Sequence, residues 1–302
     1  ERRAFMHWHL HHDGAGHHRL NLERGRDTEV AIALGCDPAT LYSATAPLPP
    51  GLDELLFAGF LRNSPVETVK AATVDLMVPA HAEFVLEGTV SAETSIEGPF
   101  GDHTGFYSDA DQYPVFTLRA ITRRRAPVYP ATIVGKPPME DYWLGKATER
   151  IFLPLIQLQL PEIIDINFPC EGVFHNCVLV SIKKEYPGHA RKVASALWGL
   201  GQMMFTKLIV VFDADVDVQN CSGAAWKAFS NVDPERDLFL TKGPLDVLDH
   251  AAPVPVFGSK AGVDATRKLP AEGHSRSWPE EIVMDEATRE LVTRRWKDYG
   301  LG

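Results

Sequence analysis

The chain has 302 residues and a formal charge of −10 at neutral pH, with a pI near 5.6. This acidic balance argues against nucleic acid as the main partner, and no apolar run is long enough to cross a bilayer. The composition, 45% hydrophobic and 23% charged, is that of a soluble globular protein with one large or two smaller domains. Four cysteines without paired spacing are typical of reduced thiols and predict a cytoplasmic location.

The first segment is rich in histidine. His7, His9 and His11 alternate, so on a strand they would share one face. Two interpretations stay open: a metal or phosphate site, and a polar surface cluster. The chain also starts at Glu1 directly on a patterned segment, so we expect further sequence before it.

Up to about residue 125, strand-like runs predominate, separated by Pro, Gly and Asp. They predict a β-barrel or curved sheet with two helical insertions, the first of which follows a capping aspartate, Asp37. The expected strands are 28–34, 74–78, 81–90 and 115–121, and the expected helices are 38–45 and 53–62.

From residue 126 onward, helical and strand patterns alternate, which indicates an α/β domain with a largely parallel sheet. The predicted boundaries therefore separate 1–125 from 126–302. An amphipathic helix over 285–298 ends the chain and suggests packing on a neighbouring subunit, hence a homo-oligomer. The expected helices are 143–160, 189–200 and 222–230, and the expected strands are 163–168, 173–182 and 207–212.

The segment from Glu97 to Gly105 places two carboxylates, Glu97 and Asp102, five residues apart on a turn rich in glycine. Nearby carboxylates are common acid/base pairs, because each charge disfavours ionisation of the other. A solvated turn is the alternative, since Asp, Gly and Pro are ordinary turn residues. His103 follows directly, and we expect it to orient Asp102.

Two further motifs are ambiguous. Asp213, Asp215 and Asp217 end an apolar strand, where they predict either a divalent-ion site or a solvated strand end. Lys260 lies between Gly258 and Gly262, in what we expect to be a flexible loop. It lacks the spacing of a nucleotide-binding P-loop, although a single lysine could reach an anionic ligand.

The ordered motifs resemble the UbiD family of reversible decarboxylases, which use prenylated flavin mononucleotide (FMN). The strongest match is the run from Val85 through the Glu97–Gly105 turn, and further matches extend over nearly the whole chain. They are ALGCDP at 33–38, DELLFAG at 53–59, IKK at 182–184, GHA at 188–190, FDADVD at 212–217 and GSKAGVDAT at 258–266.

The resemblance implies a role for each matching residue. Asp102 matches the proton donor and Glu97 its carboxylate partner. His7 and Glu54 match ligands of a divalent ion, Mn²⁺ or similar, at the cofactor phosphate. Lys260 matches a lysine that contacts the cofactor. A monovalent ion, K⁺ or Na⁺, is held in the family by backbone carbonyls that match Ser43, Ala44 and Ala46.

The chain departs from the family pattern at its front. An asparagine that completes the metal site, and an arginine that pairs with the first glutamate, would both precede Glu1. Arg2 and Arg3 do not lie in the matching context. The resemblance therefore covers roughly the later three-fifths of a family member.

The implied fold is a split β-barrel that binds flavin, followed by an α/β domain and a C-terminal helix. The implied reaction is reversible decarboxylation of an aromatic or α,β-unsaturated acid, with CO₂ as co-product. A flavin prenyltransferase would supply the cofactor, which accepts charge as CO₂ leaves. The alternatives are a non-catalytic relative acting as a subunit or scaffold, and a plain FMN-binding oxidoreductase.

Overall fold

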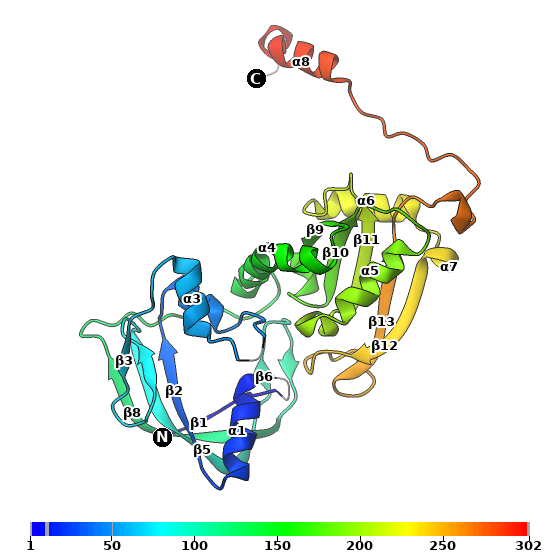
Figure 1. The fold of residues 1–302 in the computed structure, drawn as a ribbon. Coiled ribbons are helices and arrows are strands. Elements are labelled where there is room, and N and C mark those ends of the chain that lie inside the picture. Colours follow the sequence, from blue (N-terminus) through cyan, green and yellow to red (C-terminus); the bar gives the residue numbers. More distant parts are fainter. Residues whose placement is uncertain (1, 10–11, 50, 301–302) are drawn as a thin grey trace. The chain divides into compact units, whose positions relative to one another are not determined.

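The computed structural model describes residues 2–9, 12–49 and 51–300. The chain divides into two compact units, Glu1–Thr266 and Arg267–Gly302. The first unit combines helices with two main β-sheets, which confirms the predicted mixed α/β class (Figure 1).

The first sheet is antiparallel, with strand order β1-β8-β5-β2. Asp37 caps the helical insertion α2 by accepting backbone hydrogen bonds, as the sequence predicts. Asp53, expected as the first helical residue, caps α3 in the same way. The strands are β1 (Arg3–Phe5), β2 (Thr28–Leu34), β5 (Phe84–Glu97) and β8 (Asp111–Arg123), and a small pair joins β3 (Thr68–Lys70) to β4 (Met77–Pro79). The helices are α1 (Asp13–Glu23), α2 (Pro38–Ser43) and α3 (Glu54–Arg62).

The two longest strands of this sheet, β5 and β8, pair along most of their length. Gly88 is essential to their contact, because a Cβ atom there would lie 2.1 Å from the Thr117 carbonyl oxygen. Glu97 is the last residue of β5 and pairs with Asp111. The connection between them carries the short hairpin β6 (Phe100–Gly101) and β7 (Tyr107–Ser108). The carboxylate turn therefore projects from the end of the longest strand pair.

The second sheet has order β12-β13-β11-β10-β9. Its three central strands are parallel, as expected, and both edge strands are antiparallel. The strands are β9 (Ile163–Asn167), β10 (Cys177–Ile182), β11 (Leu208–Asp213), β12 (Leu238–Pro244) and β13 (Phe257–Asp264), and the helices are α4 (Glu140–Gln159), α5 (His189–Trp198), α6 (Cys221–Asn231) and α7 (Pro234–Asp237).

Each face of the second sheet has its own apolar core. On one face, α4 and α5 cover buried residues such as Val180 and Val211. On the other face, α6 contributes Ala224, which packs with Leu179 and Phe212. Side chains on both faces are therefore removed from water, which explains the near-continuous apolar runs of β10 and β11.

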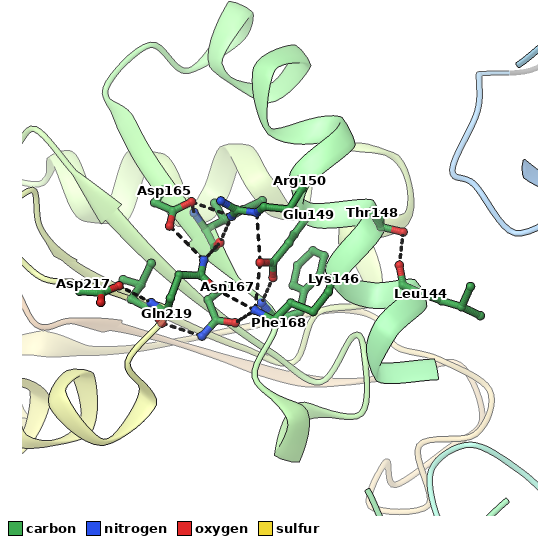
Figure 2. A network of polar contacts seen from close by, with 12 residues as sticks. Leu144, Lys146, Thr148, Glu149, Arg150, Asp165, Asn167, Phe168, Asp217 and Gln219 are labelled. Atoms are coloured by element: carbon green, nitrogen blue, oxygen red, sulfur yellow. Dashed lines mark hydrogen bonds and ion pairs between the residues drawn. The ribbon is translucent and has the colours of Figure 1, made fainter. Parts of the chain in front are cut away.

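A buried polar network fixes α4 against β9 (Figure 2). The Glu149 carboxylate accepts hydrogen bonds from Lys146 Nζ at 2.9 Å and from the Phe168 backbone N–H at 2.6 Å. Arg150 Nε lies 3.2 Å from the same carboxylate. Asn167 also accepts from Lys146 and donates to the Val218 carbonyl at 2.6 Å. The Glu149 carboxylate is buried and both of its oxygens are paired, whereas Lys146 and Arg150 are partly exposed, so the network specifies the position of α4 around one buried charge.

Several local predictions are wrong in detail. The strand expected over 173–182 begins only at Cys177, because Val173 and Phe174 have positive φ angles of 41° and 74°. The segment around Lys260 is strand β13 and not a flexible loop. Of the strand expected over 74–78, only Met77 and Val78 are in a strand, β4. Helix α1 was not predicted, because its polar sequence shows little apolar periodicity.

The second unit, 267–302, contains α8 (Glu286–Arg294) and a 3₁₀ turn at Trp296–Tyr299. The helix expected over 285–298 is therefore shorter than predicted. Asp285 caps α8 by accepting the Thr288 N–H. No described helix is long and apolar enough to span a membrane.

Candidate active site

The turn between Glu97 and Gly105 is held close to neighbouring backbone by two glycines. Gly98 has a φ of +112°, and a Cβ there would lie 3.0 Å from Ala110 Cα. Gly105 has a φ of +84°, and a Cβ there would lie 3.1 Å from the Gly135 carbonyl oxygen. Larger residues would strain both positions, so the glycines fix the path of the turn.

Asp102 is buried, with 9% of its surface exposed. Its Oδ1 atom accepts hydrogen bonds from the Thr104 backbone N–H at 2.7 Å and from the Thr104 hydroxyl at 2.5 Å. Its Oδ2 atom takes part in no hydrogen bond within the described chain. The carboxyl group is thus held by one oxygen and leaves the other available for chemistry.

Thr104 is a site residue that the sequence analysis missed. Its N–H and hydroxyl orient Asp102, whereas the sequence favours His103 for this role. An Asp side chain in a turn commonly accepts the backbone N–H two residues on, so the signal for this bond was present in the sequence.

Glu97 contacts His7, another residue singled out from the sequence. His7 Nε2 is hydrogen-bonded to Glu97 Oε2. The His7 ring stacks on Tyr113, with centroids 3.8 Å apart and planes at 11°. Burial raises the pKa of Tyr113, and the charges of Asp111 and Glu97 add to this effect. The structure therefore places one of the predicted metal ligands beside a predicted catalytic carboxylate.

The other predicted metal ligand lies elsewhere. Glu54 is the first residue of α3 and is exposed. No hydrogen bond or ion pair joins it to His7, both of which are among the described residues. Over residues 2–9, 12–49 and 51–300, no group of three or more His, Cys, Asp or Glu side chains could hold a metal ion. That search includes Asp213, Asp215 and Asp217, whereas His11 falls outside the described residues.

The three backbone carbonyls predicted to bind a monovalent ion follow α2. The Ser43 carbonyl accepts from Ala46 N–H at 3.4 Å, and the Ala46 carbonyl accepts from Leu48 N–H at 2.8 Å. Ala44 is the C-cap residue of α2. A carbonyl oxygen has a second lone pair, so these bonds are compatible with an ion.

Lys260 lies inside the second sheet. Its ammonium group donates to the Met204 carbonyl and, at 3.2 Å, to the Thr206 carbonyl. It also lies 5.9 Å from the centre of the Trp198 ring. Burial lowers the pKa of Lys260 to about 8. Its contacts in the described chain are with these groups and not with Glu97 or Asp102.

Comparison with known families identifies both halves of the first unit. Residues 1–137 match the Rift-related domain of 3-octaprenyl-4-hydroxybenzoate carboxy-lyase, UbiD. Residues 142–265 match the C-terminal domain of the same family. The chain belongs to the UbiD family.

Relatives and solved structures agree with this assignment. Uncharacterized proteins of Archaeoglobus fulgidus and Aquifex aeolicus are 52% and 51% identical to the chain over 97% and 98% of its length. The chain spans 62% and 61% of their lengths.

Among solved structures, the vanillic acid decarboxylase of Sedimentibacter hydroxybenzoicus in its closed form has a TM-score of 0.88 at 27% identity. That match covers 100% of this chain and 64% of the other. The UbiD-class enzyme HmfF of Pelotomaculum thermopropionicum, solved with FMN, has a TM-score of 0.83 at 28% identity. It covers 98% of this chain and 65% of the other.

Proposed function

We propose that this chain carries the catalytic carboxylates of a decarboxylase that uses prenylated FMN and acts on an aromatic or α,β-unsaturated acid. The observation that carries the proposal is that Asp102 is hydrogen-bonded through Oδ1 alone, on a turn that glycines fix, in a chain of the UbiD family. Similar structures include a decarboxylase and an enzyme solved with FMN. Within this class of substrates, we propose a hydroxybenzoate-like acid.

The surroundings of the turn suit a flavin. Phe100, Phe106 and Tyr107 have 47%, 59% and 79% of their surface exposed. Neighbouring exposed aromatic side chains are typical of a surface that binds a flat ring. When bound, prenylated FMN supplies an electron sink, which no side chain of the chain offers.

Asp102 is the proposed proton donor. Loss of CO₂ leaves an electron pair on carbon, and a carboxylic acid must deliver a proton to that atom. Oδ2 is suited to this task because the Thr104 hydrogen bonds fix Oδ1. Glu97, held by His7, is the proposed partner that completes the hydrogen-bond network.

The remaining site assignments stay predictions. The described residues do not assemble a divalent site, so we derive no step through Mn²⁺, and the K⁺ or Na⁺ site at Ser43, Ala44 and Ala46 has no further support. The contact of Lys260 with the cofactor is likewise a prediction. We also propose that residues 1–125 form the flavin-binding side of the protein and that the chain acts in a homo-oligomer.

The test uses the protein produced together with a flavin prenyltransferase. Mass and absorbance spectra of the bound ligand identify prenylated FMN, unmodified FMN or no flavin, and only the first result supports the decarboxylase. Asp102→Asn is expected to lower turnover about 100-fold to 10,000-fold while the flavin stays bound. Asp109→Asn, an exposed aspartate on the same connection, is the matched control. Near-native turnover by Asp102→Asn would refute the assignment.

A further inference from the structure

Two imidazoles near the candidate active site have nitrogen atoms without partners. The Nε2 atoms of His103 and His175 are shielded from solvent, and neither has a hydrogen-bond partner in the described chain. The centroids of the two rings are 5.5 Å apart, and the ring planes meet edge to face at 69°. A buried polar atom without a partner costs about 1–3 kcal/mol, so two such atoms side by side require an explanation.

The loop that carries His175 is strained. Val173 and Phe174 both have positive φ, which is uncommon for any side chain and rare for β-branched valine. Such conformations cost about 1–3 kcal/mol each and occur mainly where function requires them. The Asn176 N–H donates to the Gly172 carbonyl at 2.8 Å and closes the loop.

A glycine in α4 makes room for this loop. A Cβ on Gly145 would lie 2.6 Å from Phe174 Cδ2, so only glycine admits the phenylalanine ring. Glycine inside a helix is destabilising by roughly 0.5–1 kcal/mol relative to alanine. Two locally unfavourable features, a glycine inside a helix at Gly145 and a positive φ at Val173, therefore combine to hold His175 against His103.

One ring of the pair, His103, lines a small pocket, and Val173 of the strained loop lines it too. Asp141 is also among its lining residues, together with Tyr142 and Cys170. Burial raises the pKa of Asp141, whereas the neighbouring His103 acts to lower it. His103 follows Asp102 in the chain, so one lining residue of the pocket is the sequence neighbour of the proposed proton donor.

We propose that His103 and His175 form a hydrogen-bonding subsite for a hydroxyl substituent of the substrate acid. This inference rests on the proposed function and adds to it the residues that would recognise the ring substituent. It accounts for both unpartnered nitrogens and for the strained loop with one ligand group.

The chemistry of the pair selects a hydroxyl group. Burial lowers the pKa of His175 to about 4, so this ring is neutral at pH 7. A neutral imidazole has one donor and one acceptor nitrogen. A hydroxyl can donate to one ring and accept from the other, whereas a carboxylate only accepts and an ammonium only donates.

The test measures binding of benzoate and of the three monohydroxybenzoates to the flavin-loaded protein by calorimetry. We expect at least one hydroxybenzoate to bind about tenfold more tightly than benzoate, the gain of one well-formed hydrogen bond. His103→Leu and His175→Leu should each remove that preference. His81→Leu, at a side chain with 71% exposure, should retain it.

A second readout needs no variant. The ¹⁵N shifts of His103 and His175 should move when the preferred hydroxybenzoate is added and stay in place with benzoate. Unchanged shifts would mean that the pair holds water only, and equal binding of all four acids would also overturn the proposal. Hydroxyl preference without turnover would support the subsite but contradict the decarboxylase, whereas turnover without preference would do the reverse.

Discussion

Two buried carboxylates of the first unit, Glu149 and Asp102, differ in how completely they are paired. Glu149 accepts from Lys146, Arg150 and the Phe168 N–H, so both of its oxygens have partners. Asp102 is held through Oδ1 alone, by Thr104. A fully paired buried charge fixes structure, whereas a partly paired one retains capacity for a ligand or a proton transfer. The pairing of a carboxylate thus separates scaffold from site.

The largest expected effect on stability is at Glu149. Glu149→Leu would leave the buried Phe168 N–H without its acceptor and leave Lys146 with neutral partners only, so we expect the free energy of unfolding to fall by about 3–5 kcal/mol. Activity per folded molecule should stay unchanged. Chemical denaturation, combined with active-site titration of the folded fraction, measures both quantities.

Glu149→Gln provides a milder variant, because its amide oxygen still accepts one hydrogen bond. Glu290→Leu, on an exposed position of α8, is the control and should change stability by less than about 0.5 kcal/mol. A loss of activity in folded Glu149→Gln would erase the distinction between the two carboxylates.

The next effect is the pH dependence that His175 gives to stability. Burial lowers the pKa of His175 from 6.5 to about 4, with opposing contributions from Asp246 and Asp249 and lowering ones from His103 and Lys207. Below pH 6.5 the unfolded chain takes up a proton that the folded chain resists, so stability falls as the pH drops from about 6.5 to about 4.

We expect this contribution to reach at most about 3 kcal/mol. His175→Phe keeps the ring but removes the titration, so its unfolding free energy should vary less between pH 6.5 and 4. His81→Phe, at an exposed histidine, should follow the unmodified protein. An identical slope in His175→Phe would show that this ring does not titrate differently on folding.

The smallest effect is expected at Thr104. Thr104→Val removes the hydroxyl that donates to Asp102 Oδ1 but keeps the backbone bond. We expect kcat to fall about threefold to tenfold with little change in KM, and the pH profile of kcat to shift. Thr117→Val, at an exposed threonine of β8, should change neither quantity. An unaltered pH profile would mean that Thr104 does not position Asp102.

Much of the fold could be predicted, because the spacing of apolar residues along the sequence indicates which side chains are buried. Strand β2 coincides with the predicted 28–34, Asp37 caps the helix expected after it, and α3 begins one residue after the predicted start at Asp53. Lys260 could not be placed, because flanking glycines suggest a loop, whereas here Gly262 leaves room for the ring of Phe239, its partner on the neighbouring strand β12.

Only part of the candidate site could be predicted from the sequence. Glu97 and Asp102 are recognisable by residue type and motif. The pairing of His103 with His175 is not, because it depends on positive φ at Val173 and on space at Gly145, distant in sequence. Contacts between separate elements are set by packing, which a single sequence does not encode locally.

The central claim is that Asp102 delivers the proton to the carbon that loses CO₂. The most direct test follows hydrogen–deuterium exchange at that carbon of the decarboxylated product in D₂O, with flavin-loaded protein and Asp102→Asn compared by NMR. We predict exchange in the unmodified protein and none above background in the variant, at equal flavin content. Exchange at a near-native rate in Asp102→Asn would contradict the claim.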